Sequence, residues 1–192
     1  VTLPEGYVVS WGGQFENLER AQTRLAIVVP VALLLVLTLL YLSLRSARDV
    51  ALIATGIPFA FVGGVAALAM RGIPFSVSAA VGFIALAGIA VLNGQILVGA
   101  IRRNLEDGLA FPEAITRAGG ERLRPVLATA ITDAVGFIPM AISVGVGAEV
   151  QRPLATVVIG GVISSTILTL FVLPILYRMF GTSVESPSAK PI

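Results

Sequence analysis

A few polar side chains lie within long apolar runs of this sequence, and these are the residues best placed to do chemistry. Asp133 is the one ionisable residue well inside such a run, with Thr129 and Thr132 beside it. Asn93 and Gln95 lie in the middle of another run. An ionisable residue within a membrane span is costly, so it marks a functional site by default. If the two runs are neighbouring helices, these groups form a polar cluster able to carry protons or water. The alternative is a structural hydrogen-bonded contact without transport chemistry.

The sequence lacks the side chains that most enzymes and metal centres use. It contains no Cys and no His, which excludes disulfides, thiolate or imidazole metal sites, and Ser-His or Cys-His catalysis within the chain. One buried acid supplies neither a nucleophile–base pair nor a two-carboxylate site, which argues against an intramembrane enzyme. We therefore expect no cofactor and no tightly bound metal. The balance of 13 basic and 11 acidic residues gives no sign of nucleic-acid binding.

Five apolar stretches must position these polar groups. They cover residues 25–44, 50–70, 75–101, 126–146 and 154–177. A helix needs about 20 residues to cross roughly 30 Å of hydrocarbon, and every stretch is long enough. With 56% hydrophobic and 12% charged residues, the chain has too few charges for the surface of a soluble domain. The sequence thus predicts an all-α membrane protein, a bundle of five transmembrane helices in a lipid bilayer.

The two ends of the chain differ from the apolar part. Residues 7–11 predict a short strand before the turn signal Gly12-Gly13, so residues 1–24 resemble the end of a soluble domain that leads into a helix. Residues 181–192 are rich in Ser and Pro and predict a disordered tail. Because the first residue is Val1 rather than Met, we expect the chain to be a fragment of a longer protein.

The basic residues predict the orientation of the spans. With five spans, the two ends of the chain lie on opposite sides of the membrane. One side collects eight arginines and Lys190, and the other collects only four arginines: Arg20, Arg24, Arg71 and Arg152. Positive residues favour the cytoplasmic side. The amino end is therefore expected outside and the carboxyl end in the cytoplasm.

The connectors and the small residues carry further signals. Residues 112–118 predict an amphipathic surface helix that Gly119-Gly120 would end. Residues 149–152 are interpreted as a solvated loop before a helix that starts at Pro153. Small residues at helical spacing predict close contacts between helices: Gly56, Ala60 and Gly64 on the second stretch, and Gly160-Gly161 on the fifth.

Five longer motifs make the sequence recognisable. They are GGQFEN at 12–17, PFAFVGG at 58–64, GFIALAGIAVLNG at 82–94, RLRPVL at 122–127 and GAEVQRPLATVVIGG at 147–161. In this order they resemble the resistance-nodulation-division (RND) efflux pumps, in the heavy-metal branch of the cobalt–zinc–cadmium type. The resemblance covers residues 4–178.

The resemblance implies a fold, partners and a location. RND pumps of this type have twelve transmembrane helices and large periplasmic domains, and they work as homotrimers in the bacterial inner membrane. They take up protons from the periplasm and export metal cations through a periplasmic adaptor and an outer-membrane channel. By this resemblance, residues 1–24 are the end of the periplasmic porter region, and residues 25–180 hold helices eight to twelve of the pump.

The resemblance carries over to only some residues of the proton relay. The acidic residues of the family's fourth helix have no counterpart in this chain. Arg122 and Thr129 match positions that assist the relay in drug-exporting relatives. Leu92 stands where drug pumps have a lysine and monovalent-metal pumps a glutamate, and Asn93 follows it, as in divalent-metal pumps. Val126 stands where monovalent-metal pumps have a lysine. These departures imply divalent cations such as zinc, cobalt, nickel or cadmium. Asp133 falls where the family has a small residue, so its role cannot be carried over.

The candidate relay residues of this chain are therefore Asn93, Thr129, Asp133 and Arg122, and Asp133 is included for its place within an apolar run rather than for the resemblance. Two other functions stay open at this point. An RND pump for organic compounds is disfavoured by Leu92 in place of lysine. Nothing in the sequence excludes an inactive truncated membrane remnant, and intact flanking sequence would settle this alternative.

Overall fold

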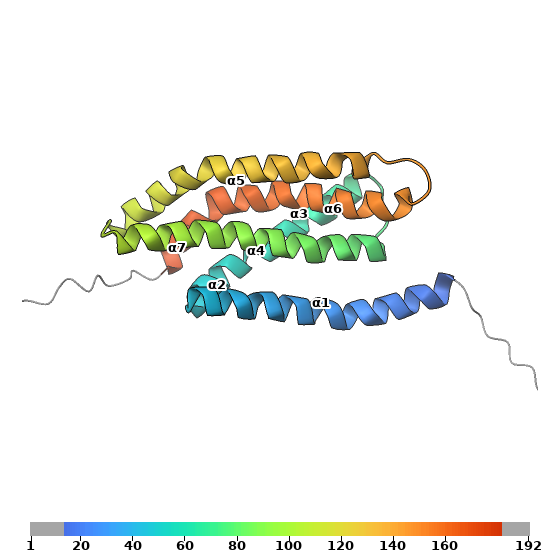
Figure 1. The fold of residues 1–192 in the computed structure, drawn as a ribbon, viewed down its shortest axis with the longest axis horizontal. Coiled ribbons are helices and arrows are strands. Elements are labelled where there is room, and N and C mark those ends of the chain that lie inside the picture. Colours follow the sequence, from blue (N-terminus) through green and yellow to red (C-terminus); the bar gives the residue numbers. More distant parts are fainter. Residues whose placement is uncertain (1–13, 182–192) are drawn as a thin grey trace, which may run out of the picture.

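The computed structural model describes residues 14–181, with side chains from residue 23 onward. Its elements in chain order are α1 (Gln14–Leu44), α2 (Ala47–Ala54), α3 (Gly56–Met70), α4 (Val77–Glu106), α5 (Phe111–Ala141), α6 (Ala148–Ile167), the π-helical turn η1 (Leu168–Val172) and α7 (Leu173–Phe180) (Figure 1). The strand expected at residues 7–11 and the tail at 182–192 lie outside the described residues.

Five helical segments are long and apolar enough to cross a membrane, which confirms the predicted fold class for the described part of the chain. They are Thr23–Leu44, Ala47–Met70, Val77–Glu106, Phe111–Ala141 and Ala148–Phe180. The second joins α2 to α3, and the fifth joins α6 through η1 to α7. Helices are the form that satisfies backbone polar groups without water, which explains why the apolar stretches adopt it.

Short polar signals set where several helices begin. Ser46 accepts a hydrogen bond from the Asp49 backbone N–H through its Oγ, at 3.3 Å, and so caps the start of α2. Ser76 accepts one from the Ala79 N–H at 3.2 Å and caps α4 in the same way. Between α3 and α4 the chain turns at Gly72, whose φ of 61° suits a glycine. The connections between spans are consequently short, and neighbouring spans run antiparallel.

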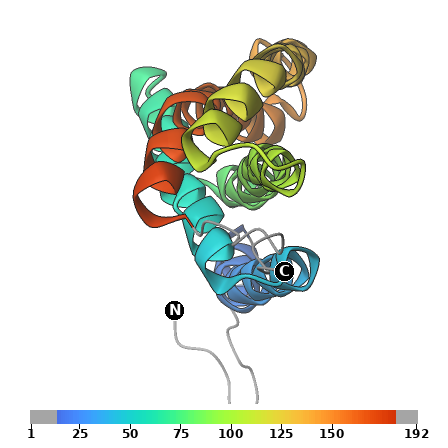
Figure 2. The same cartoon turned by 90° about the vertical axis from the view of Figure 1, so that its left-hand side faces the viewer.

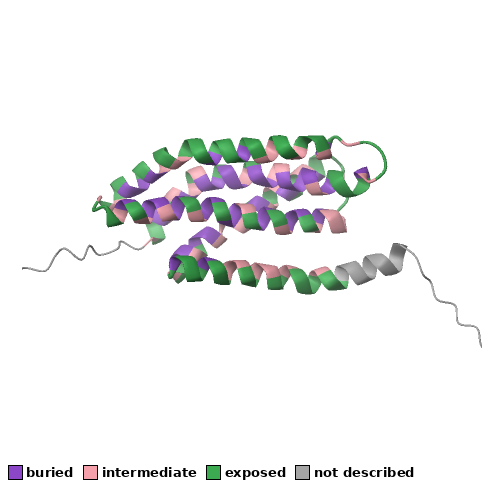
Figure 3. Ribbon diagram, in the orientation of Figure 1, coloured by how far each residue is buried: buried purple, intermediate pink, exposed green. Residues whose placement is uncertain are grey.

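α4 and α6 form the centre of the bundle. α6 packs against α3, α4 and α5, whereas α1 contacts chiefly α4 and α2. Figures 1 and 2 show α1 at one edge of the bundle, apart from α5 and α6. Figure 3 shows α4 and α6 mostly buried, with α1 and α5 largely exposed. The exposed faces of α1 and α5 are apolar, as expected for surfaces that meet lipid or other membrane helices.

α3 and α6 approach each other closely at two glycines. A Cβ added to Gly63 would lie 2.3 Å from the Ser164 Cβ and 2.5 Å from the Gly160 carbonyl oxygen. A Cβ added to Gly160 would lie 2.4 Å from the Ala67 Cβ. Ser164 Oγ donates across the same interface to the Phe59 carbonyl at 2.7 Å. The two backbones thus touch directly, which only small residues permit.

The predicted row of small residues also lies in this interior. Ala60 and Gly64 are buried, and a Cβ on Gly64 would meet the Phe83 ring at 2.8 Å. Gly161 makes room for Leu86 of α4, since a Cβ there would lie 2.0 Å from the Leu86 Cδ2. The small residues therefore seat both α3 and α4 on α6.

Two expectations about the connectors are wrong. Gly119-Gly120 do not end a helix, because α5 runs without a break from Phe111 to Ala141. Buried Ile115 and Ala118 hold this part of α5 in the core, and an Arg117–Glu121 ion pair at 2.8 Å spans the two glycines. Packing thus outweighs the low helix propensity of glycine.

Residues 149–152 are helical rather than a loop, because α6 begins at Ala148, five residues before Pro153. The backbone N–H groups of Val150 and Gln151 donate to the Gly147 carbonyl, at 3.1 and 3.2 Å, and so start the helix early. The side chains of Glu149 and Arg152 are therefore held on a helix at the end of a span.

A bulky residue at the α3–α6 contact should destabilise the bundle. We expect Gly160→Leu to lower the free energy of unfolding by at least about 1–3 kcal/mol, because a side chain cannot fit between the backbones without moving them. Thermal unfolding of the detergent-solubilised full-length protein measures this. Gly88→Leu is the matched control, since no atom lies within 4 Å of a Cβ at that position. Equal melting temperatures for the two variants would contradict the proposed packing.

Candidate functional site

Asn93 is buried in the middle of the bundle. Its side chain is 2% exposed and lies on the face of α4 that also carries Leu86, Ala90 and Leu97. Its Nδ2 is buried and has no hydrogen-bond partner among the described residues. An unpaired buried amide is costly, because it has lost its bonds to water without replacing them. Asn93 therefore has a free donor inside the protein.

A π-helical turn lies at the level of Asn93. Gly82 of α4 contacts Leu154 and Val157 of α6, and Leu86 contacts Gly161, so the two helices run parallel in a fixed register. Continued along both helices, that register brings η1 beside Asn93. Single π turns disturb the regular backbone hydrogen bonds and occur frequently at functional sites. The middle of the bundle thus combines the unpaired Nδ2 of Asn93 with the π-helical turn η1.

Buried hydroxyl groups on α6 stand close in sequence to this turn. Ser165 and Thr166 are buried, and both donate to the Val162 carbonyl of their own helix, at 3.1 and 2.7 Å. These hydroxyls are therefore occupied within α6, which agrees with the absence of a described partner for Asn93.

Thr129 and Asp133 lie one helical turn apart on α5. Thr129 is exposed, and its Oγ1 donates to the Pro125 carbonyl at 3.0 Å. Asp133 is half-buried. The inward face of this part of α5 carries Val126 and Ala130, and Asp133, three residues after Ala130, lies at the edge of that face. Positions i and i+4 share one face of a helix, so Thr129 and Asp133 are neighbours.

The structure does not bring the sequence-predicted residues into one cluster. α4 and α5 are in contact, but no hydrogen bond in the described part of the chain joins Asn93 to Thr129 or Asp133. Arg122 lies nearly two turns before Thr129 on α5, half-buried, with its Nε buried and unpaired within the described residues. Asn93 thus faces the interior of these five spans, whereas Thr129 is exposed and Asp133 is half-buried at the edge of the inward face of α5.

The most deeply buried charge in the described chain was not among the predicted residues. Asp49, at the start of α2, is fully buried, and its Oδ2 lies 2.5 Å from Nη2 of Arg102 near the end of α4. Arg102 also donates through Nη1 to the Leu44 carbonyl, at 2.5 Å, at the end of α1. Tyr177 of α7 is buried in an apolar cluster that also contains Leu44 and Ile101. Its hydroxyl has no hydrogen-bond partner in the described chain.

This ion pair ties several helix ends together. Arg102 joins the last carbonyl of α1 to the first turn of α2, and an arginine at a helix carboxyl end also complements the helix dipole. A buried carboxylate is tolerated only when it is paired, so Asp49 depends on Arg102. The spacing of Ser46 and Asp49 signals a helix start. Nothing in the sequence identifies Arg102 as the partner, because that follows from how α2 packs on α4.

No group of three or more acidic residues converges to form a metal site within the described residues, which contain no His or Cys. The polar side chains within the described spans and at their ends form hydrogen bonds and ion pairs. They include the unpaired Nδ2 of Asn93, the Thr129 and Asp133 pair, and the Asp49–Arg102 ion pair.

Removing one member of the buried ion pair should be severe. Arg102→Gln leaves the Asp49 carboxylate buried and unpaired, and we expect a loss of about 3–5 kcal/mol in the free energy of unfolding. The combined change Asp49→Asn with Arg102→Gln should recover much of that loss, since no charge then remains. Denaturation of the purified full-length protein in detergent provides the measurement. Arg103→Gln, at an exposed neighbouring position, serves as the control. A loss no larger than that of the control would show that the pair contributes nothing.

Comparison with known proteins gives consistent matches. The AcrB/AcrD/AcrF family model matches residues 1–181. The cobalt-zinc-cadmium resistance protein CzcA of Cupriavidus metallidurans is 58% identical over 179 residues, 93% of this chain and 17% of that protein. The nickel-cobalt-cadmium resistance protein NccA of Alcaligenes xylosoxydans xylosoxydans is 56% identical over 174 residues, 91% of this chain and 16% of that protein.

A solved structure agrees with these sequence matches. A crystal structure of a heavy metal efflux pump superposes with a TM-score of 0.78 at 49% sequence identity, covering 90% of this chain and 17% of the other. The chain therefore spans about a sixth of the length of the proteins it matches.

Proposed function

Because this chain belongs to the AcrB/AcrD/AcrF family, we propose that it is the carboxyl-terminal membrane portion of a proton-driven exporter of divalent metal cations. Membership confirms the resemblance to RND pumps that the sequence motifs carry. The family consists of transporters rather than enzymes. The observation that carries the proposal is the identity of 56–58% over more than nine-tenths of the chain to proteins named for nickel, cobalt, zinc and cadmium resistance. These relatives favour metal ions over organic compounds.

The neighbourhood of Asn93 supports the assignment to divalent cations. Leu92 is 52% exposed on the outward face of α4, while Asn93 points inward. The position that the resemblance associates with a lysine or a glutamate is thus apolar here, and its neighbour is neutral. A relay through this helix relies on an amide, which donates and accepts hydrogen bonds without taking up charge.

Asp133 is the carboxylate of α5 that we assign to proton uptake. Thr129 stands one turn away on the same face, and its hydroxyl is held by the Pro125 carbonyl at 3.0 Å. When Asp133 is ionised, this hydroxyl rotates to donate to the carboxylate; when Asp133 is protonated, it returns to Pro125. Such an exchange of partners converts protonation into a change in the hydrogen bonds within α5.

The position of Pro125 makes α5 responsive to that exchange. Proline has no N–H, so the carbonyl one turn earlier, on Glu121, loses its helical donor. Arg122, the fourth proposed relay residue, lies within this weakened turn, and its unpaired Nε is free to take a new partner. Protonation at Asp133 would thus reach Arg122 through a short, bendable segment of one helix.

The proposed location and partners follow from the same family. The chain would lie in the bacterial inner membrane, with its amino end in the periplasm and its carboxyl end in the cytoplasm. The distribution of charge supports this orientation, because Arg45, Arg48, Arg102 and Arg178 lie at helix ends on one side of the five spans, and Arg71 and Arg152 lie at helix ends on the other. The whole pump would act as a homotrimer with a periplasmic adaptor and an outer-membrane channel. Residues 1–24 would end its periplasmic porter region.

Metal tolerance tests the proposed function. A bacterium without its own exporters, expressing the full-length protein with its adaptor and channel, should grow at higher concentrations of zinc, cobalt, nickel or cadmium. Tolerance to copper, silver and organic compounds should not change. Resistance to copper, silver or drugs alone would show that the divalent assignment is wrong, and no resistance at all would indicate an inactive remnant.

The Asp133 assignment is tested by substitution in the same cells. Asp133→Ala should abolish most of the gain in tolerated metal concentration, because the carboxylate that takes up the proton is gone. Thr129→Val should reduce it less, and Thr129→Ser should preserve it. Glu113→Ala, which removes an exposed acid from the same helix, is the control. Unchanged tolerance in Asp133→Ala cells with normal membrane expression would reject the relay role.

A further inference from the structure

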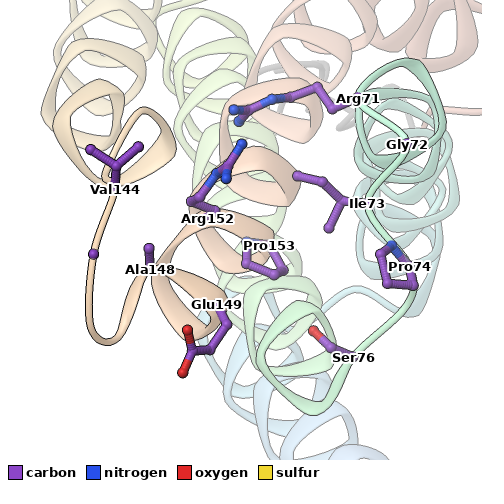
Figure 4. A pocket seen from close by; sticks show the side chains of 11 residues that line it. Arg71, Gly72, Ile73, Pro74, Ser76, Val144, Ala148, Glu149, Arg152 and Pro153 are labelled. Atoms are coloured by element: carbon purple, nitrogen blue, oxygen red, sulfur yellow. The ribbon is translucent and has the colours of Figure 1, made fainter.

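A cavity of about 590 Å³ opens at the end of the bundle opposite the Asp49–Arg102 pair. It lies between the turn that joins α3 to α4, the loop that joins α5 to α6, and the first turns of α6 (Figure 4). These segments connect the ends of spans, so the cavity sits at the depth of the lipid headgroups.

Two arginines from different segments point into this cavity. The Arg71 guanidinium is fixed from behind, since Nη1 donates to Thr156 Oγ1 at 2.6 Å and Nη2 to the Ala141 carbonyl at 2.8 Å. Thr156 Oγ1 in turn donates to the Arg152 carbonyl at 2.6 Å, which brings the two arginines close together. Figure 4 shows both guanidinium groups directed toward one another across the cavity.

Arg152 lacks a counter-ion. Its guanidinium has no ion pair or hydrogen bond among the described residues. The one acid that lines the cavity, Glu149, points away from both arginines in Figure 4. Two guanidinium groups and one carboxylate leave the lining with a net charge of +1. Two positive charges that face each other repel. An anion between them would relieve this repulsion and accept hydrogen bonds from both guanidinium groups.

Apolar residues beside the cavity indicate the kind of anion. Val144, which lines the cavity, is 87% exposed. Residues close in sequence to the lining residues are also exposed: Met70 at 85%, Phe75 at 71% and Ile142 at 68%. A free phosphate ion has no use for such apolar side chains, whereas the acyl chains of a lipid would cover them. From this combination we infer that Arg71 and Arg152 bind the phosphodiester headgroup of an anionic phospholipid. The net positive charge favours a headgroup without a compensating ammonium. This lipid site is independent of which cation the protein transports.

The test measures lipid binding to the full-length protein in nanodiscs of phosphatidylcholine doped with phosphatidylglycerol. Native mass spectrometry of the released protein gives the apparent affinity for each lipid. Arg152→Gln should weaken phosphatidylglycerol binding about tenfold, the cost of losing a charge-assisted hydrogen-bond pair. Glu149→Gln should strengthen it, because the lining gains net positive charge. Phosphatidylcholine binding should change in neither variant.

The two substitutions change the charge in opposite directions, so misfolding cannot imitate the expected pattern. Arg152→Lys should fall between Arg152→Gln and the unmodified protein, since it keeps the charge but loses the fork. Excess inorganic phosphate should leave the bound phosphatidylglycerol in place. Equal phosphatidylglycerol affinities in the Gln variants and the unmodified protein would overturn the proposal. Displacement of the lipid by inorganic phosphate would also overturn it, in favour of a free-phosphate site.

Discussion

The direct backbone contact between α3 and α6 fixes the rest of the described structure. Gly63 and Gly160 approach so closely that no side chain fits between them. In lipid, helices gain nothing from hiding apolar surface, so association depends on close packing and on hydrogen bonds such as that from Ser164 to Phe59. Gly161, next to Gly160, then seats Leu86 and with it α4. Because α4 and α6 are held parallel in this way, Asn93 and the π turn η1 lie at one level.

The Asp49–Arg102 ion pair also holds helices together, near the carboxyl end of α4. It holds the ends of α1, α2 and α4 together where the helices leave the apolar core. The interior therefore has one dry, glycine-based contact and one charged contact. Asn93 lies between them with an unpaired amide. Of the groups assigned to proton uptake, Thr129 is exposed and Asp133 is half-buried. In the proposed pump the exposed surface of α5 would be covered by parts of the protein that the chain does not contain.

The sequence predicts the features of this fold that depend on local composition. Length and hydropathy determine the five spans, and the spacing of small residues indicates close packing at Ala60, Gly64 and Gly160-Gly161. Features that depend on tertiary contacts were missed. Gly119-Gly120 look like a helix end, but the buried Ile115 and Ala118 keep α5 helical. Asp49 looks like a residue outside a span, because hydropathy cannot show that α2 brings it against Arg102. In the described chain no hydrogen bond joins Asn93 to Asp133. Their separation depends on how α4 packs on α5, which no sequence pattern specifies.

The central claim is that a proton gradient drives divalent metal ions through a pump whose membrane portion includes this chain. Zinc flux in proteoliposomes containing the purified full-length protein tests it most directly, with a zinc-sensitive dye inside and an imposed pH difference across the membrane. The account predicts zinc movement in the direction opposite to proton flow, which stops when the gradient is collapsed. Zinc flux that is unaffected by collapsing the gradient, or no zinc flux from an intact and correctly inserted protein, would contradict it.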